Sequence, residues 1–125
     1  MHVILTSNQD PEDERKYWSL TVGLQYEVIG ISADNYRILD DTGDPVIFNQ
    51  LCFEIMDPSE PDFWEVSFGD GGERYANPPE WHKPGFFEDF HDHVGPVRQQ
   101  FWKDHRKYYG EPRSPTKSRD AWRHM

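Results

Sequence analysis

Apolar and polar residues alternate along the first half of the chain in short segments. Between positions 20 and 57, residues that favour β-structure fill the segments 20–24, 26–31, 36–39, 45–48 and 52–56, and a further short apolar segment covers 3–5. A period of two predicts β-strands. Turn-forming residues at 33–35 and 40–44 separate these strands, and 49–51 is long enough for one 3₁₀ turn. The pattern therefore predicts an antiparallel meander.

The second half of the chain follows a helical period. Gly95 and Pro96 open a helix over 95–109, and Gly110 ends it. Its apolar stripe consists of Val97, Phe101, Trp102, His105, Tyr108 and Tyr109, and its basic face of Arg98, Lys103, Arg106 and Lys107. We expect this basic face to lie beside the acidic remainder of the molecule.

The segments between the meander and this helix are less regular. A short helix is predicted over 86–92, with Phe86 and Phe90 on one face. The proline-rich segment 77–85 is expected to wrap over the sheet, held by Tyr75 and Trp81. Segment 60–72 is compatible with a further strand or with a loop anchored by its aromatic residues.

These elements predict a mainly β fold with a C-terminal α-helix. The expected architecture is an SH3-like small barrel of about five strands, followed by the amphipathic helix at about 95–109. A single domain would cover residues 1–110, and 111–125 would form a basic, flexible tail. Aromatic residues are 15% of the chain, so large rings must supply much of the core: Trp18, Phe48, Phe53, Trp64, Phe87 and Trp102.

Three stretches within residues 20–57 carry a resemblance to a known family. They read Leu20-Thr-Val-Gly-Leu-Gln-Tyr-Glu-Val-Ile-Gly-Ile, Asp34-Asn-Tyr-Arg-Ile-Leu-Asp-Asp41 and Phe53-Glu-Ile. This pattern resembles the core of small bacterial SH3-like-barrel proteins of the toxin-immunity type. The resemblance implies an SH3-like barrel without a catalytic motif, and a function as an immunity protein that neutralises a cognate interbacterial toxin by binding it.

Charge is distributed unevenly along the chain. The net charge is −10, but residues 1–97 contain 20 acidic and 5 basic residues, whereas 98–125 contain 3 and 8. An acidic body repels phosphate backbones and anionic lipids and attracts basic proteins. We therefore expect a basic protein partner, with no direct binding of nucleic acid or membrane. The same charge also permits an alternative, a DNA mimic that blocks a nucleic-acid-binding protein.

Cysteine content and the N-terminus bear on the compartment. Cys52 is the only cysteine, which excludes an internal disulfide and fits a reducing environment. The first residues have no basic flank and no long apolar run of the kind found in signal peptides. A cytoplasmic protein is expected.

Two groups of residues are candidates for partner binding, because carboxylates around aromatic anchors suit a cationic protein surface. The first group would form one end of the meander and consists of Asp34, Tyr36, Asp40, Asp41 and Asp44. The second group consists of Asp70, Glu73, Glu88, Asp89 and Asp92.

A catalytic or metal site has weaker support. His82, His91 and His93 lie near several acids and leave a metal-dependent enzyme as a second alternative. In the predicted short helix, however, His91 and His93 would point about 200° apart. The sequence contains no zinc-protease, paired-cysteine, EF-hand, phosphate-loop or nucleophile-elbow motif. Cys52, within a predicted strand, suits a structural thiol. We expect no catalytic residues, metal or cofactor.

Overall fold

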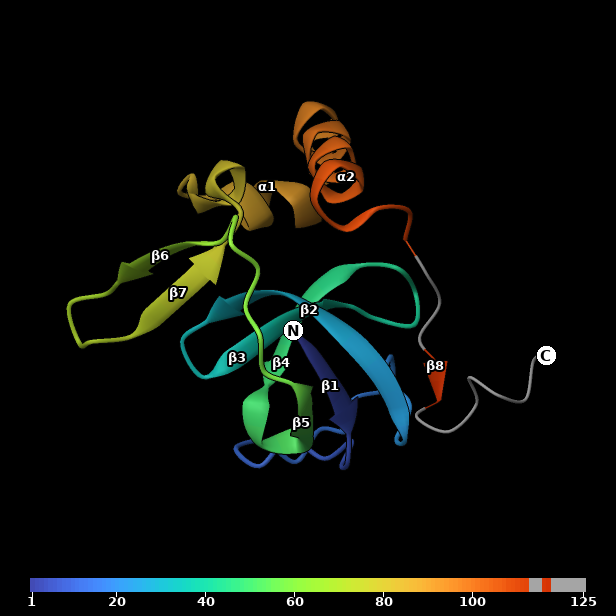
Figure 1. Cartoon of the computed structure of the whole chain (residues 1–125). Coiled ribbons are helices and arrows are strands. Elements are labelled where there is room, and N and C mark those ends of the chain that lie inside the picture. Colours follow the sequence, from blue (N-terminus) through green and yellow to red (C-terminus); the bar gives the residue numbers. More distant parts are fainter. Residues whose placement is uncertain (113–115, 118–125) are drawn as a thin grey trace.

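The computed structural model describes residues 1–112 and 116–117 and is mainly β with a C-terminal helix (Figure 1). The first five strands follow the predicted meander closely. They are β1 His2–Leu5, β2 Leu24–Ser32, β3 Asn35–Leu39, β4 Pro45–Asn49 and β5 Phe53–Asp57, with the 3₁₀ turn η1 Gln50–Cys52 between the last two. The expected 3₁₀ turn is confirmed, and the Asn49 side chain caps it by accepting the Leu51 N–H.

These strands pair antiparallel in the order β4-β3-β2-β1-β5. The central strand β2 has nine residues and takes part in two halves of the sheet, pairing with β1 near its start and with β3 near its end. Its register with β3 shifts between Val28 and Gly30, which leaves Ile29 as a bulge that bends the strand. Among the described residues β4 and β5 do not pair with each other, so the sheet does not close into a continuous barrel.

A hairpin extends the sheet beyond the meander. It consists of β6 Glu65–Phe68 and β7 Arg74–Asn77, and β7 pairs with the end of β2. Figure 1 shows the hairpin projecting to the left of the remaining sheet. Of the two alternatives for segment 60–72, the strand is therefore present. Thr116–Lys117 form β8 against the start of β2, and the rest of the predicted flexible tail, apart from residues 111–112, lies outside the described residues.

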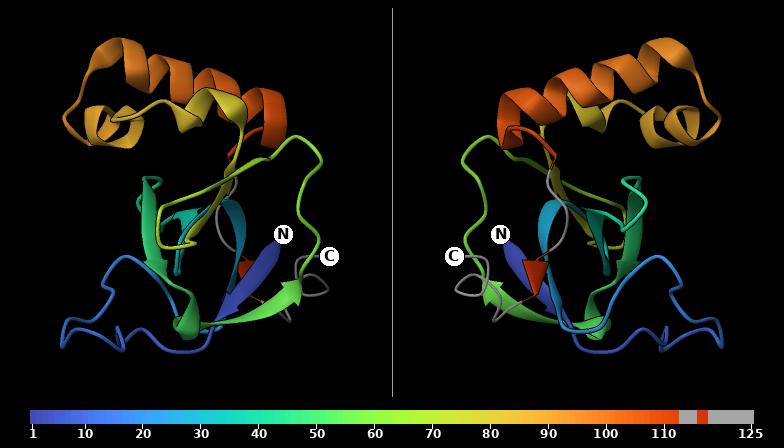
Figure 2. Two further views of the ribbon diagram at one scale, coloured as in Figure 1. Left: turned by 90° about the vertical axis from the view of Figure 1, so that its left-hand side faces the viewer. Right: turned by 90° about the vertical axis from the view of Figure 1, so that its right-hand side faces the viewer.

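A helical layer covers one side of the sheet (Figures 1 and 2). It contains the 3₁₀ turn η2 Pro79–His82 and the helices α1 Phe86–His91 and α2 Gly95–Tyr109, which confirms both predicted helices. The layer has its own core, separate from that of the meander, formed by Ile29, Trp81, Phe86, Phe90 and Phe101. Burial of these large rings is what stabilises the layer on the sheet.

Hydrogen bonds join the helical layer to β2 and to the residue that precedes β6. The Tyr109 hydroxyl donates to the Ile29 carbonyl at 2.8 Å and accepts the Trp64 indole N–H at 2.8 Å. Within the helical layer, the indole N–H of Trp81 in η2 donates to the carboxylate of Asp104 in α2 at 3.1 Å. Because Ile29 is the bulged residue of β2, Tyr109 supplies a partner to a carbonyl outside the β2–β3 register.

Two expectations about residues 18–24 are wrong. Only Leu24 of the segment 20–24 belongs to a strand, because Gly23 has a φ of 89° and donates its N–H to the Leu5 carbonyl in a turn. Trp18 is 83% exposed and is no part of the core. Its neighbour Tyr17 packs there instead, edge-on to Phe48 at 4.9 Å. No helix in the described part of the chain is both long and apolar enough to cross a membrane.

Candidate protein-binding surface

The turn between β6 and β7 is formed by Gly69-Asp70-Gly71-Gly72. Gly72 has a φ of 86°, which favours glycine, and the Gly69 N–H donates to the Glu73 carbonyl at 2.8 Å. The Glu73 carboxylate accepts the Gly71 N–H at 3.0 Å. An added Cβ at Gly69 or Gly71 would meet this carboxylate, and the flexible Glu73 side chain would have to move. Gly72 therefore allows the tight turn, and Asp70 and Glu73 give it an acidic tip.

Large apolar side chains lie exposed on this hairpin. Phe68 is 69% exposed and Val66 is 43% exposed, and their spacing of two places them on the same face of β6. Arg74 is opposite Phe68 in the register, and Glu60 holds its guanidinium through hydrogen bonds of 2.6 and 2.9 Å. Glu60 thereby neutralises the one basic side chain of the hairpin.

The remaining charges of the hairpin are acidic. Glu65, Asp70 and Glu73 are exposed, and no Lys, Arg or His side chain of the described residues lies within ion-pair distance of them. Asp34 is exposed in the β2–β3 turn. This turn lies beside the hairpin, because the neighbouring Ala33 donates its N–H to the Arg74 carbonyl at 2.9 Å. We call Asp34, Val66, Phe68, Asp70 and Glu73 the hairpin surface.

The first predicted group of binding residues does not come together. Asp34 lies before β3, whereas Asp40, Asp41 and Asp44 lie after it. Five strand residues separate the two ends by about 17 Å. The expectation that the group shares one end of the meander is therefore wrong, because successive turns of a meander lie at alternate ends of the sheet.

Several members of this group support the fold from inside. Asp40 is 6% exposed and accepts hydrogen bonds from the Thr42 and Asp44 N–H groups at 2.9 and 3.1 Å. Tyr36 is 5% exposed and packs edge-on to a phenylalanine of β5, so it offers no surface anchor.

Asp41 is exposed, but its carboxylate is already engaged. It accepts hydrogen bonds from the Thr21 and Tyr26 hydroxyls, both at 2.8 Å. These bonds hold the turn before β2 against the β3–β4 turn. Asp41 therefore connects two loops of the meander.

The second predicted group divides between two places. Asp70 and Glu73 belong to the hairpin tip, whereas Glu88 and Asp89 are exposed on α1 and Asp92 caps its end. In Figure 1 the tip points away from α1. The structure thus brings Asp34 to Asp70 and Glu73, and separates the α1 acids from them.

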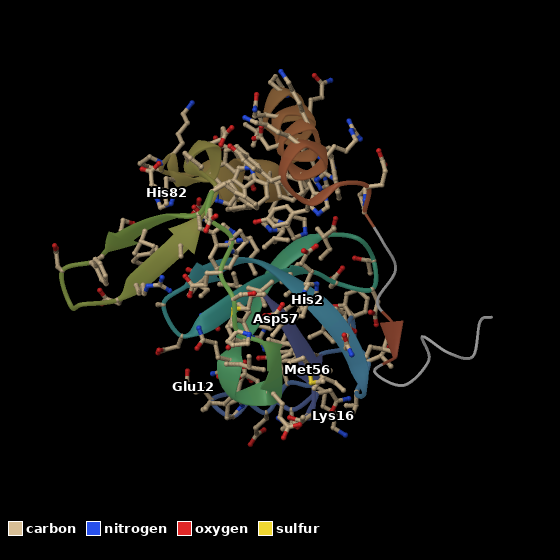
Figure 3. The ribbon with its side chains drawn as sticks, in the orientation of Figure 1. His2, Glu12, Lys16, Met56, Asp57 and His82 are labelled. Carbon is tan, nitrogen blue, oxygen red and sulfur yellow. The ribbon has the colours of Figure 1, made fainter. Side chains whose placement is uncertain are left out.

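The three histidines of the predicted cluster have separate partners. His82 Nε2 lies 2.7 Å from the Glu65 carbonyl at the base of the hairpin (Figure 3), and His91 Nε2 lies 3.1 Å from a carbonyl of β4. The His93 ring is 3.3 Å from a guanidinium nitrogen of Arg98. Within the described residues no three His, Cys, Asp or Glu side chains are placed to hold a metal ion.

No family model matches the sequence, and searches of the curated proteins and of the solved structures found no match either.

The basic face of α2 is partly engaged with the acidic part of the molecule, as expected. Lys107 lies 3.4 Å from Glu80 of η2, and the Tyr108 hydroxyl donates to the same carboxylate at 2.8 Å. Partial burial opposes ionisation, but these hydrogen bonds lower the pKa of Glu80. Lys103 and Arg106 are exposed. α2 therefore contributes a separate basic surface on the helical layer.

Sequence reasoning identified the acids of the hairpin but not its apolar anchor. Val66 and Phe68 lie in segment 60–72, for which the sequence left a further strand and a loop anchored by aromatic residues as alternatives. All four residues of β6 are exposed. The sequence signal is that acids precede this short apolar segment and that glycines with two further acids follow it.

Proposed function

We propose that this protein is an acidic protein-binding module, an immunity protein that neutralises a cognate interbacterial toxin by direct binding. The observation that carries the proposal is Phe68, a largely exposed aromatic side chain on a projecting hairpin among exposed carboxylates. Aromatic residues are enriched among the side chains that dominate binding energy in protein interfaces. Surrounding carboxylates would accelerate and orient the approach of a basic partner.

The SH3-like barrel belongs to the same proposal. It is supported by the strand order β4-β3-β2-β1-β5, by the bent β2 that serves both halves of the sheet, and by the 3₁₀ turn before β5. The resemblance of residues 20–57 to immunity-type proteins supports the same reading. The buried, unpaired Cys52 fits the cytoplasmic location that this function requires.

A DNA mimic is the second candidate, supported by the charge of residues 1–97, where acids outnumber basic residues 20 to 5. The two candidates differ in what binding depends on. A DNA mimic binds through many distributed charges, so its affinity falls steeply with salt and DNA competes with it. A hairpin anchored by Phe68 retains affinity at high salt and loses it when the ring is removed.

Affinity capture and a growth assay test the proposal together. Wild type, Phe68→Ala and Asp70→Lys are used as baits, and Met56→Ala is the control, because Met56 is 51% exposed on β5, away from the hairpin (Figure 3). We expect wild type and Met56→Ala to recover one basic protein in stoichiometric amount. The two hairpin variants should lose it, and should no longer protect cells that express that protein.

Either of two results would contradict the proposal. The first is equal recovery by all four baits, which would place binding elsewhere. The second is a recovered protein whose expression does not impair growth, which would remove the toxin from the account and leave a general binding module.

A further inference from the structure

A cleft of about 290 Å³ lies between the sheet and the helical layer, and its walls come from β2, β3, β7, η2 and the start of α1. Gly30 forms part of the wall at a narrow point, where an added Cβ would lie 3.1 Å from the Cβ of Asn77. Its volume is near the lower end of the range found for small-molecule sites. Tyr75, Trp81 and Phe87 give the cleft an aromatic wall.

Arg37 of β3 is the charged group held deepest in this cleft. Its guanidinium carbon lies 3.6 Å from the centroid of the Phe87 ring, and Nη1 donates to the Pro45 carbonyl at 3.1 Å. Among the described residues no carboxylate lies within 4.0 Å of it. A guanidinium has five N–H donors, so most of this donor set is free for another acceptor.

The surroundings of Arg37 favour an anion. Burial lowers the pKa of Arg37 to about 10, and the charge of Glu88 at the rim opposes this shift. At neutral pH the side chain is still a cation, and it is partly withdrawn from water with no carboxylate within 4.0 Å among the described residues. The stacking on Phe87 holds the planar donor set in one orientation, which suits bidentate binding of a carboxylate.

Two further features narrow the ligand class. Lys83 and Glu88 line the same cleft, so that with Arg37 its charged side chains sum to one net positive charge, which suits a singly charged anion better than a doubly charged one such as phosphate. Asn77 also lines the cleft, and its side-chain oxygen is buried without a hydrogen-bond partner among the described residues. The cleft thus combines a cationic donor for a carboxylate with an aromatic wall, and a donor elsewhere on the ligand would satisfy the Asn77 oxygen.

We propose that this cleft binds a small organic monocarboxylate, with its carboxylate on the Arg37 guanidinium and its apolar body against the aromatic wall. The site is independent of the hairpin surface and goes beyond the proposed function, so the failure of one leaves the other intact. Binding involves no covalent step. It would place a small-molecule ligand between the sheet and the helical layer.

The test is a titration of the full chain with benzoate, phenylacetate and hexanoate, in which binding is monitored through the NMR chemical shifts of the backbone amides and the indole N–H groups. We expect saturable shifts at Gly30, Asn77 and the Trp81 indole for at least one of these acids. The neutral isostere benzamide and inorganic phosphate should each bind at least tenfold more weakly. Absence of localised shifts for all three acids, or equal binding of benzamide, would overturn the proposal, and equal binding of phosphate would overturn the monocarboxylate assignment.

Two variants establish the role of the charge. Arg37→Gln should weaken binding of the best acid at least tenfold, and wild-type affinity would contradict the proposal. Because Arg37 also packs against the helical layer, the exposed Glu88→Gln provides a second variant that leaves the core unchanged. It should tighten binding on the order of threefold, as expected for removing one nearby exposed like charge. Unchanged affinity in Glu88→Gln would refute the electrostatic argument.

Discussion

The hydroxyl of Tyr109 joins α2 to the sheet at two points, and Tyr109→Phe removes that one atom. The hydroxyl donates to the Ile29 carbonyl and accepts the Trp64 indole N–H, both at 2.8 Å. The phenylalanine ring would keep its contacts with Phe63 and His105, whose centroids lie 5.3 and 5.2 Å away. The variant therefore isolates the hydrogen bonds from the packing.

The expected loss follows from the burial of the two partners. Ile29 is 1% exposed and Trp64 is 8% exposed, so the variant leaves two buried polar groups without their hydrogen-bond partner. Leaving a buried donor or acceptor unsatisfied costs about 1–3 kcal/mol. Because Tyr109 itself is only half-buried and water can partly substitute, we expect a total loss of about 2 kcal/mol. For a domain of this size that lowers the Tm by roughly 8 °C.

Urea denaturation followed by tryptophan fluorescence measures this loss. Tyr108→Phe is the matched control, since the Tyr108 hydroxyl contacts only the part-exposed Glu80 carboxylate and Lys107 lies beside it. Its loss should be at most about 1 kcal/mol. An equal or smaller loss in Tyr109→Phe than in Tyr108→Phe would refute the argument that Tyr109 fixes α2 to the bulge of β2.

Three further outcomes are expected, each measured by chemical denaturation. Phe101→Ala should lower the free energy of unfolding by about 3–5 kcal/mol, because Phe101 is 0% exposed and stacks on Trp81 at 4.7 Å. A loss smaller than that of Tyr109→Phe would contradict the claim that the helical layer has a core of its own. Asp40→Ala should lose about 1–3 kcal/mol, and Asp40→Asn less, because its amide oxygen can still accept the turn N–H groups. Burial lowers the pKa of His105 below its usual 6.5, so the unfolded chain binds more protons and the free energy of unfolding falls as the pH is lowered through about 6.5. His105→Gln should make the free energy of unfolding depend less on pH, and an unchanged slope would contradict the attribution of this dependence to His105.

Elements with strong local signals could be predicted from the sequence. The strands β2 and β3 alternate with period two, β4 and β5 are short segments rich in β-favouring residues between turn residues, and α2 begins at Gly95-Pro96 and ends at Gly110. Strand β7 has no such signal, since Arg74-Tyr75-Ala76-Asn77 is short and mostly polar. It is a strand because Ala76 packs fully buried opposite Ile31 of β2, a contact between segments distant in sequence.

The candidate site was predictable in composition but not in arrangement. The sequence identified Asp34, Asp70 and Glu73 as acids near turns, yet placed Asp34 with Asp40, which lies at the other end of β3. Which turns meet depends on how β7 pairs with β2, and that pairing comes from tertiary packing. The pairing of β7 with β2 also explains why Phe68 is exposed, because the paired hairpin projects from the sheet instead of folding over it (Figure 1).

The dissociation constant of the complex with the basic protein recovered by capture tests the central claim most directly. It is measured for wild type, Phe68→Ala and Met56→Ala at low and high salt. We predict tight binding by wild type and Met56→Ala that persists at high salt, and affinity about 30-fold weaker in Phe68→Ala, as for a dominant interface residue. Unchanged affinity in Phe68→Ala, together with binding that disappears at high salt in all three proteins, would contradict the hairpin account and favour a DNA mimic.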